Sequence, residues 1–259
     1  MATGGTVPIV LPTEQLVRDV PAWTDRFAAL LESSDPGTPV PTTPKWTMAE
    51  LARHVGFSFR WMTTIVATRA TAPVRGRDTK GRPAPDDPAE TPSWLREGAT
   101  ELVAAVRSTG PTTPVWAWAG GSQPAEWWLQ RMLFELVVHV ADATLASGKP
   151  VRIDAELAAA GIDEWLTIVP FVHADEMTEA LPPGRSMHLH ALDGGEWLLR
   201  GTPDGLAWER GHTKADVAVR GTAGALYLLL NRRLPADDPD VEIHGDRAVL
   251  DTWLTTTPF

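Results

Sequence analysis

Residues 131–143 constrain the fold more than any other part of the chain. This stretch is long, apolar and free of glycine and proline, so it predicts a buried helix rather than a strand. Glu135 and His139 interrupt it, and their spacing of four residues places them on one face of the helix. A buried carboxylate and a buried imidazole need partners. Either the two bond each other or the backbone, or they bind a divalent metal ion together with a third ligand from elsewhere.

The composition restricts the class of protein. With 259 residues, 43% of them hydrophobic and 22% charged, the chain can form one large domain or two ordinary ones. A net charge of −10 argues against a nucleic-acid binder. No apolar run is long enough to span a membrane, and residues 1–12 lack the basic and apolar regions of a signal peptide. We therefore expect a cytoplasmic protein that binds neither nucleic acid nor membrane, with monomer and dimer both open.

The chain contains no cysteine. This excludes disulfides, thiolate metal ligands and a nucleophilic thiol of the protein itself, so any sulfur chemistry requires an external thiol. The 12 tryptophans contrast with a single tyrosine, and we expect many of them to line the core or a pocket. Residues 114–118, which include two tryptophans, are a candidate cavity wall.

Helical spacing of the apolar residues predicts an all-helical part up to about residue 175. Two prolines interrupt this pattern: Pro21 predicts a kink or break near Val20, and Pro170 predicts the end of a helix. Residues 70–93 predict a long loop, either a solvated linker or a lid. The expected helices cover residues 12–33, 47–68, 94–108, 126–147 and 154–169.

The second of these helices has the clearest start signal. Thr47 and Glu50 have the spacing of a capping box, and Trp46 and Leu51 occupy the positions of a hydrophobic staple. His54 follows one turn later, beside the apolar stripe. Taken alone, a single histidine at this place is an ordinary residue at the edge of a core.

Alternation replaces the helical pattern near residue 187. Residues 187–192 and 196–200 flank Gly194 and Gly195 and predict a β-hairpin. His188 and His190 share one face of its first strand, which we expect to face solvent, so we predict no metal site there. Further strands are expected over 208–210, 215–220 and 241–246, with helices over 222–232 and 248–254. The sequence thus predicts an α+β, mainly helical fold with domains at residues 1–175 and 176–259.

Three segments resemble a known enzyme family. Residues 44–56 are similar to the motif Pro-x-Trp-(Thr/Ser)-x-x-(Asp/Glu)-Leu-x-x-His-(Leu/Val)-Gly of the mycothiol-dependent maleylpyruvate isomerase family. Residues 131–143 resemble its second motif, and residues 219–246 are similar to its C-terminal domain. Each motif is modest alone, but together they occur in the family's order over nearly the whole chain. They are specific to the superfamily and not to one reaction.

The resemblance implies a DinB-like four-helix bundle followed by a small α+β domain related to sterol-carrier proteins. It also implies zinc as a cofactor, with His54, Glu135 and His139 as ligands, and mycothiol as the thiol. Arg233 matches the family's arginine after the leucine run and is a candidate catalytic residue that binds a substrate carboxylate. The alternative for Arg233 is a solvated helix end.

Two histidines and one carboxylate form an open zinc site, at which a bound thiol becomes a nucleophilic thiolate. An isomerase would add this thiolate to a conjugated cis alkene, allow rotation and eliminate it, whereas an S-transferase would leave it on the substrate. Both need a small electrophilic substrate, and the sequence does not separate them. The alternatives are a thiol-independent zinc enzyme of secondary metabolism and a non-catalytic small-molecule binding protein.

Overall fold

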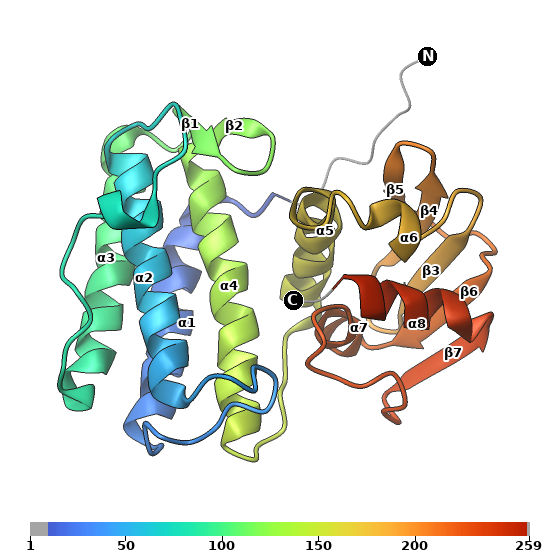
Figure 1. The fold of residues 1–259 in the computed structure, drawn as a ribbon, viewed down its shortest axis with the longest axis horizontal. Helices are drawn as coiled ribbons and strands as arrows, with labels where there is room; N and C mark the ends of the chain where they lie inside the picture. Colours follow the sequence, from blue (N-terminus) through green and yellow to red (C-terminus); the bar gives the residue numbers. More distant parts are fainter. Residues whose placement is uncertain (1–9, 258–259) are drawn as a thin grey trace. The chain divides into compact units, whose positions relative to one another are not determined.

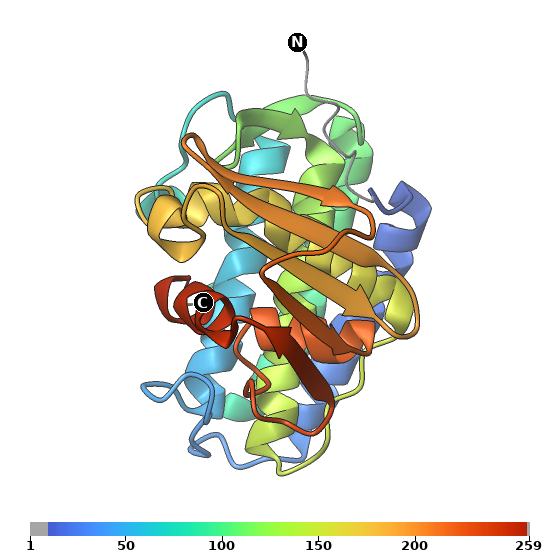
Figure 2. The same cartoon turned by 90° about the vertical axis from the view of Figure 1, so that its right-hand side faces the viewer.

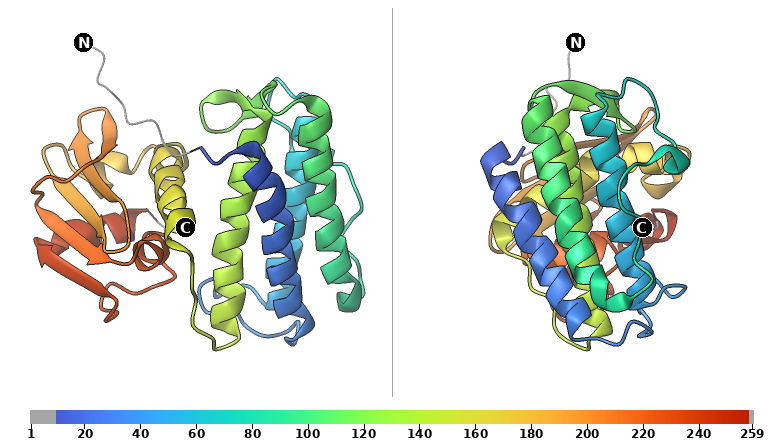
Figure 3. Two further views of the ribbon diagram at one scale, coloured as in Figure 1. Left: turned by 180° about the vertical axis from the view of Figure 1, so that it is seen from behind. Right: turned by 90° about the vertical axis from the view of Figure 1, so that its left-hand side faces the viewer.

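Four long helices pack side by side over Leu11–Val151 in the computed structural model, which describes residues 10–257 (Figures 1 and 3). Each helix buries an apolar stripe; α1 and α2 both pack on α3 and on α4. The predicted four-helix bundle is therefore confirmed. Its helices are α1 (Thr13–Glu32), α2 (Met48–Ala67), α3 (Thr91–Thr109) and α4 (Ala125–Ala146).

The start of α2 follows the capping prediction, whereas α1 departs from its prediction. The backbone N–H of Thr47 donates to the Glu50 carboxylate at 2.7 Å, and the Thr47 hydroxyl accepts from the Glu50 N–H. In α1, a kink or a break was expected near Val20; the break does not occur, because the helix continues through Pro21 to Glu32. Val20 and Phe27 are fully buried on either side of the proline. This packing outweighs the roughly 3 kcal/mol that an interior proline costs a helix.

Residues 70–93 are mostly exposed, but hydrogen bonds attach them to the bundle. Trp61 Nε1 donates to the Val74 carbonyl at 2.8 Å, and Trp94 Nε1 donates to the Arg82 carbonyl at 2.9 Å. Two short 3-10 turns, η1 (Gly76–Asp78) and η2 (Pro88–Glu90), lie within this segment. The segment is therefore a largely exposed strap that is attached to α2 and α3.

A short hairpin that the sequence did not predict precedes α4. It consists of β1 (Pro114–Ala117) and β2 (Gly121–Pro124), paired antiparallel. The ring of Trp116 in β1 lies 6.1 Å from that of Trp61 and 6.3 Å from that of Trp128, measured between centroids. The tryptophans of this region thus pack on one another at the end of the bundle.

The second unit continues from Arg152 and is built on a five-stranded sheet with the order β5-β4-β3-β6-β7 (Figure 2). All neighbouring strands are antiparallel except β3 and β6, which are parallel. Helices α5 and α7 lie behind the sheet in Figure 2. The strands are β3 (Ser186–Ala191), β4 (Glu196–Thr202), β5 (Gly205–Arg210), β6 (Val217–Gly221) and β7 (Val241–Gly245). The helices are α5 (Ala155–Val172), α6 (Met177–Ala180), α7 (Ala223–Leu230) and α8 (Arg247–Thr256).

Helix α5 changes the expected domain boundary. It was expected to belong to the helical part, but the compact units divide between Val151 and Arg152 because α5 packs on α7 and on β5. Pro170 lies inside the last turn of α5 and does not end it, since the helix continues to Val172. The α+β, mainly helical fold class is confirmed, with helices in both units.

The sequence predicts neither a membrane-spanning helix nor a signal peptide. Among the described residues, no helix combines the length and apolarity needed to cross a membrane. The expectation that residues 1–12 form no signal peptide refers mostly to residues 1–9, which lie outside the described part of the chain.

Candidate metal centre

The three predicted ligands come together on two facing helices of the bundle. His54 Nε2 on α2 lies 2.8 Å from Glu135 Oε1 on α4, and His139 Nε2 lies 3.3 Å from the same oxygen. The ligand atoms of these residues all lie within 4.8 Å of one another. The spacing of four residues within α4 therefore does place Glu135 and His139 on one face, and the packing of α2 on α4 supplies the third residue.

The centre is buried on the α4 side and open on the α2 side. The side chain of His139 is 5% exposed and that of Glu135 is 15% exposed, whereas that of His54 is 35% exposed. The Trp46 ring covers part of the opening, with its centroid 4.8 Å from that of His54. Trp46 was expected only as a staple residue of α2; its place immediately before the N-cap is what brings it beside His54.

Hydrogen bonds orient the ring of His139. Its Nδ1 lies 2.8 Å from Asp142 Oδ2, and the Thr42 hydroxyl donates to the other oxygen of Asp142. A carboxylate only accepts, so in the neutral ring the proton is on Nδ1 and the lone pair of Nε2 points toward Glu135. This is the tautomer that a metal-binding histidine needs. Thr42 was not foreseen, because it lies in the loop before α2.

The two oxygens of Glu135 have different partners. Arg131, one turn earlier on α4, lies 3.2 Å from Oε2, while both imidazoles approach Oε1. The arginine thus fixes the carboxylate and leaves Oε1 directed between the two histidines. Arg131 is itself buried, with its side chain 6% exposed, so the contact is shielded from water.

The pKa values of Glu135 and His139 depend on each other and on their neighbours. Burial alone would raise the pKa of Glu135, but hydrogen bonds to His139 and His54 and the charge of Arg131 lower that pKa well below its ordinary value. Burial alone would lower the pKa of His139, but its bonds to Asp142 and Glu135 raise that pKa. In the metal-free centre, the carboxylates of Glu135 and Asp142 therefore favour the protonated form of His139.

These directions predict how the metal-free protein responds to pH. The contribution of His139 to the free energy of unfolding is complete below its ordinary pKa of about 6.5 and is lost as pH rises through the raised value. The contribution of Glu135 is present above its ordinary pKa of about 4.5 and is lost as pH falls through the lowered value. The ion pair of Glu135 and His139 therefore stabilises the metal-free bundle most between about pH 4.5 and about pH 6.5.

Urea denaturation in the presence of a chelator measures this effect. The wild type should exceed the His139→Gln variant in free energy of unfolding by more at about pH 6 than at about pH 9. Subtracting the variant removes the pH dependence that comes from other groups. An equal difference at both pH values would contradict the raised pKa of His139.

The donor set fits a divalent metal ion. Two imidazoles and one carboxylate are the ligands of open zinc sites, and their donor atoms already converge. The tautomer of His139 is fixed by an outer carboxylate, as is usual for metal-binding histidines. We therefore treat His54, Glu135 and His139 as a candidate metal centre.

The candidate anion-binding arginine lies in the other unit, after α7. Arg233 is 5% exposed, and its Nη1 donates to the Asn231 carbonyl at 2.6 Å, so it is not a solvated helix end. The neighbouring Arg232 has a left-handed backbone with φ 63°, and its buried Nε and Nη2 make no hydrogen bond with any described atom. Burial, followed by the charge of Arg233, lowers the pKa of Arg232.

The expectation that His188 and His190 face solvent is wrong. The side chain of His188 is only 6% exposed and that of His190 is 27% exposed. Both lie beside Glu196, with His212 close to the same carboxylate. One feature of the sequence could have predicted this cluster. The predicted turn at residues 194–195 places Glu196 across the hairpin from His190.

Two family models match the chain. Residues 17–144 match the mycothiol maleylpyruvate isomerase N-terminal domain, and residues 156–252 match the MDMPI C-terminal domain. No curated protein sequence matches the chain. The matched segments correspond to the bundle and to the sheet unit in turn.

Solved structures with a similar fold include a mycothiol-dependent maleylpyruvate isomerase. That crystal structure is 17% identical to this chain, covers 90% of this chain and 93% of its own, and has a TM-score of 0.56. A point mutant of a mycothiol-dependent maleylpyruvate isomerase has 14% identity, the same coverage and a TM-score of 0.57. A UbiJ-SCP2 ubiquinone synthesis protein, 18% identical, covers 41% of this chain and 93% of its own. Its TM-score of 0.32 is too low to support an argument.

Proposed function

Because the chain belongs to the mycothiol-dependent maleylpyruvate isomerase family, a family of enzymes, we propose that it uses mycothiol as a nucleophile toward a small electrophilic substrate, at a zinc ion held by His54, Glu135 and His139. The observation that supports this most directly is the approach of both Nε2 atoms to Glu135 Oε1. The reaction is either cis-trans isomerisation or S-transfer.

The proposed cofactors supply the reactive group. Zinc bound at this centre would keep a coordinated thiol deprotonated at neutral pH. Mycothiol would supply the nucleophile, whose reversible addition to a conjugated cis alkene permits rotation and whose irreversible addition gives a thioether. The absence of cysteine from the chain means that no protein thiol competes for this position.

The residues of the chain prepare the centre for this chemistry. One carboxylate and two neutral imidazoles carry a total charge of −1, so they do not neutralise a divalent ion. Asp142 holds His139 with Nε2 directed inward, and Arg131 holds Glu135 with Oε1 directed inward. The partly exposed edge of His54 is the side on which a thiol and a substrate can enter.

We further propose that the arginine pair after α7 binds a carboxylate of the substrate. Arg233 was the residue expected from the sequence, but its neighbour has buried N–H groups that no described residue accepts. A guanidinium with buried, unsatisfied N–H groups is stabilised by an anion, and its fork matches a carboxylate. We therefore propose Arg232 as the main contact, with Arg233 keeping the turn in place through its bond to Asn231.

The Arg232→Gln variant tests this assignment. It should raise the KM for a carboxylate substrate about tenfold while leaving zinc content unchanged, since one charge-assisted hydrogen bond contributes about 1.5–3 kcal/mol. A substrate analogue in which an amide replaces the carboxylate should show no such difference between variant and wild type. An unchanged KM for the acid would contradict the role of Arg232.

Replacing Asp142 tests how the centre is oriented. The Asp142→Asn variant should bind zinc about 10- to 100-fold more weakly than the wild type, because an amide oxygen is a weaker, uncharged acceptor for the Nδ1 proton and the amide NH2 group is a donor. A competition titration with a chromophoric chelator measures the affinity. The Thr42→Val variant, which keeps the carboxylate, should show a smaller loss. Equal affinities for Asp142→Asn and wild type would contradict the orienting role.

Metal content tests the centre itself. The protein, purified without a metal-binding tag, is analysed by mass spectrometry for zinc alongside His54→Ala and His139→Ala. Each variant should hold one zinc fewer than the wild type. The control is His244→Ala on β7, whose side chain is 59% exposed, and it should keep the wild-type content. Wild-type zinc content in both centre variants would overturn the proposed site.

A thiol assay separates the possible reactions. The protein is incubated with maleylpyruvate and mycothiol, and products are followed by nuclear magnetic resonance. Formation of the trans isomer with mycothiol recovered identifies an isomerase, and a thioether formed one-to-one with lost thiol identifies a transferase. Turnover that is equal without any thiol would overturn the role of mycothiol and favour a thiol-independent zinc enzyme.

A further inference from the structure

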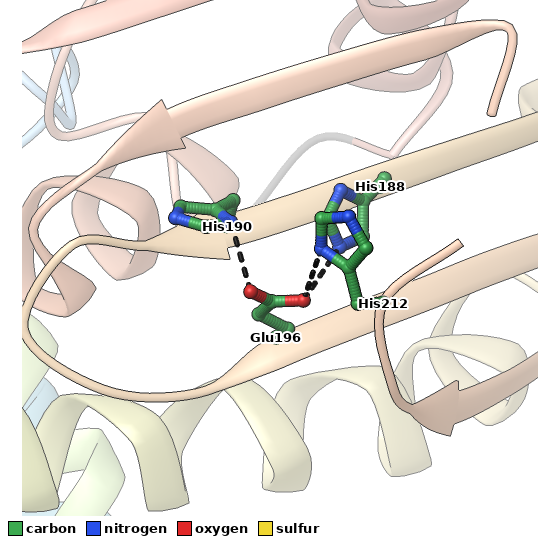
Figure 4. A group of neighbouring side chains, drawn as sticks. All are labelled: His188, His190, Glu196 and His212. Atoms are coloured by element: carbon green, nitrogen blue, oxygen red, sulfur yellow. Dashed lines mark hydrogen bonds and ion pairs between the residues drawn. The ribbon is translucent and has the colours of Figure 1, made fainter. Parts of the chain in front are cut away.

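A second group of histidines lies on the sheet of the unit that continues from Arg152. His188 and His190 are two residues apart on β3, so both lie on the face of the sheet opposite the one that packs on α7. Glu196, the first residue of β4, is directly opposite His190 in the antiparallel ladder. His212 lies in the connection after β5 and completes the group, as Figure 4 shows.

All three imidazoles turn a nitrogen toward the carboxylate of Glu196 (Figure 4). His190 Nδ1 lies 3.0 Å from Oε1, while His212 Nδ1 lies 2.7 Å and His188 Nε2 lies 3.4 Å from Oε2. The four possible ligand atoms lie within 4.8 Å of one another. These residues come from three separate segments of the chain, so their convergence is not a consequence of local spacing alone.

Hydrogen bonds and ion pairs account for only part of this arrangement. His188 is more than nine-tenths buried, yet the one contact of its Nε2 within the group is the 3.4 Å approach to Glu196 Oε2, which is too long and poorly aligned to count as a hydrogen bond. Glu196 Oε2 already accepts from His212. A buried polar atom without a partner is rare in folded proteins and needs an explanation. An ion between the four side chains would use the free lone pair of His188.

We propose that His188, His190, Glu196 and His212 bind a divalent transition-metal ion, with zinc as the expected occupant. Imidazole nitrogens favour zinc, copper and nickel, whereas calcium and magnesium prefer all-oxygen ligands. Three imidazoles and one carboxylate fill a four-coordinate shell and leave no open position. The ion at this second site therefore has a structural role, unlike the proposed ion of the helical bundle.

The second site would fasten the connection between β5 and β6 to the centre of the sheet. Residues 211–216 form this connection, and the Gly211 N–H already donates to the Glu196 carbonyl at 3.1 Å. The side chain of His212 is 74% exposed, so it can reach the ion or leave it without disturbing the core. Zinc should accordingly slow amide hydrogen exchange in residues 211–216.

The experiment uses the full chain carrying His54→Ala and His139→Ala, which removes the ligands of the bundle centre. Zinc binding to this parent is measured by competition with a chromophoric chelator, and cobalt absorption is recorded as a second readout. The parent should bind one zinc ion. Adding His212→Ala should weaken binding about tenfold or more, since even outer partners of a metal contribute 10- to 100-fold. Adding His244→Ala, also an exposed histidine beside a glutamate, should change nothing.

Each outcome decides the proposal separately from the function of the bundle centre. Absence of zinc binding in the parent, or unchanged affinity on adding His212→Ala, would overturn the second site. If the parent does not fold, the same comparison is made in the wild-type background. There His212→Ala should remove one equivalent of zinc while activity with mycothiol persists. Loss of zinc on adding His244→Ala would indicate nonspecific binding to surface histidines. That result would also overturn the proposed second site.

Discussion

The Glu135→Gln protein is expected to lose its bound metal and its activity. Glu135 Oε1 is the atom that both His54 and His139 approach, and it is the only anionic donor of the three. An amide has the same shape but no charge, so it binds a divalent ion much more weakly. Because loss of an outer partner already costs about 10- to 100-fold in affinity or activity, loss of this direct ligand should cost more. Zinc content and kcat/KM with mycothiol measure the two effects.

The substitution also affects folding, and this must be separated from the loss of metal. A neutral amide at this position would remove the ion pair between Arg131 and Glu135, and breaking a buried ion pair costs up to about 3–5 kcal/mol. The matched variant is His54→Ala, which leaves the contact between Arg131 and Glu135 in place. It should lose zinc and activity, while the chelated protein should lose less free energy of unfolding than Glu135→Gln does, since only the hydrogen bond between His54 and Glu135 is removed. Full activity in either folded variant would contradict the proposed centre.

The Gly56→Ala variant is expected to be destabilised by at least about 3 kcal/mol, the upper range for adding atoms to a packed core. A helical glycine replaced by alanine would otherwise gain up to about 1 kcal/mol. Here a Cβ atom would lie 1.9 Å from Cζ3 of Trp94. Trp94 is 2% exposed, donates to the Arg82 carbonyl and lies under the guanidinium of Arg60, 4.2 Å from the ring centroid. The ring therefore cannot move aside.

Urea denaturation of the chelated protein gives the free energies of unfolding for this test. Trp94→Leu alone should destabilise the bundle, because it leaves a cavity. The double variant Gly56→Ala/Trp94→Leu should be more stable than the sum of the two single effects by about 1 kcal/mol or more, since the leucine makes room for the added methyl group. Wild-type stability of Gly56→Ala would show that α2 and α3 are less tightly packed than described. The expected shift of α2 would also displace His54, two residues away.

Most of the bundle centre was predictable because the features that indicate it lie close together in the sequence. Glu135 and His139 lie one turn apart on a helix that apolar content alone identifies. The capping box at Thr47 sets the start of α2 and therefore the face on which His54 lies. The proposed third ligand, His54, still required resemblance to a family, since no periodicity indicates that α2 packs on α4. Thr42 and Trp46 were not expected at the centre, because loop conformation decides where they lie.

The sheet site was not predictable in the same way. The spacing of His188 and His190 places them on one face of β3. Alternation does not show whether that face is exposed to solvent. The outcome depends on the hairpin register, which sets Glu196 opposite His190, and on the connection that returns His212 to the same place. Neither proline ends its helix, for two different reasons: residues on both sides of Pro21 are buried in the core, whereas Pro170 lies in the last turn of its helix.

The division of the chain at residue 151 has a consequence for biosynthesis. The boundary follows all three residues of the candidate bundle centre, His54, Glu135 and His139. None of them therefore belongs to the sheet unit. Domains generally fold as units, the N-terminal one first, as the chain leaves the ribosome. The bundle ligands can therefore gather before β3 has been translated. The group on the sheet can assemble only after His212 has left the ribosome, because its four side chains come from segments on both sides of β5.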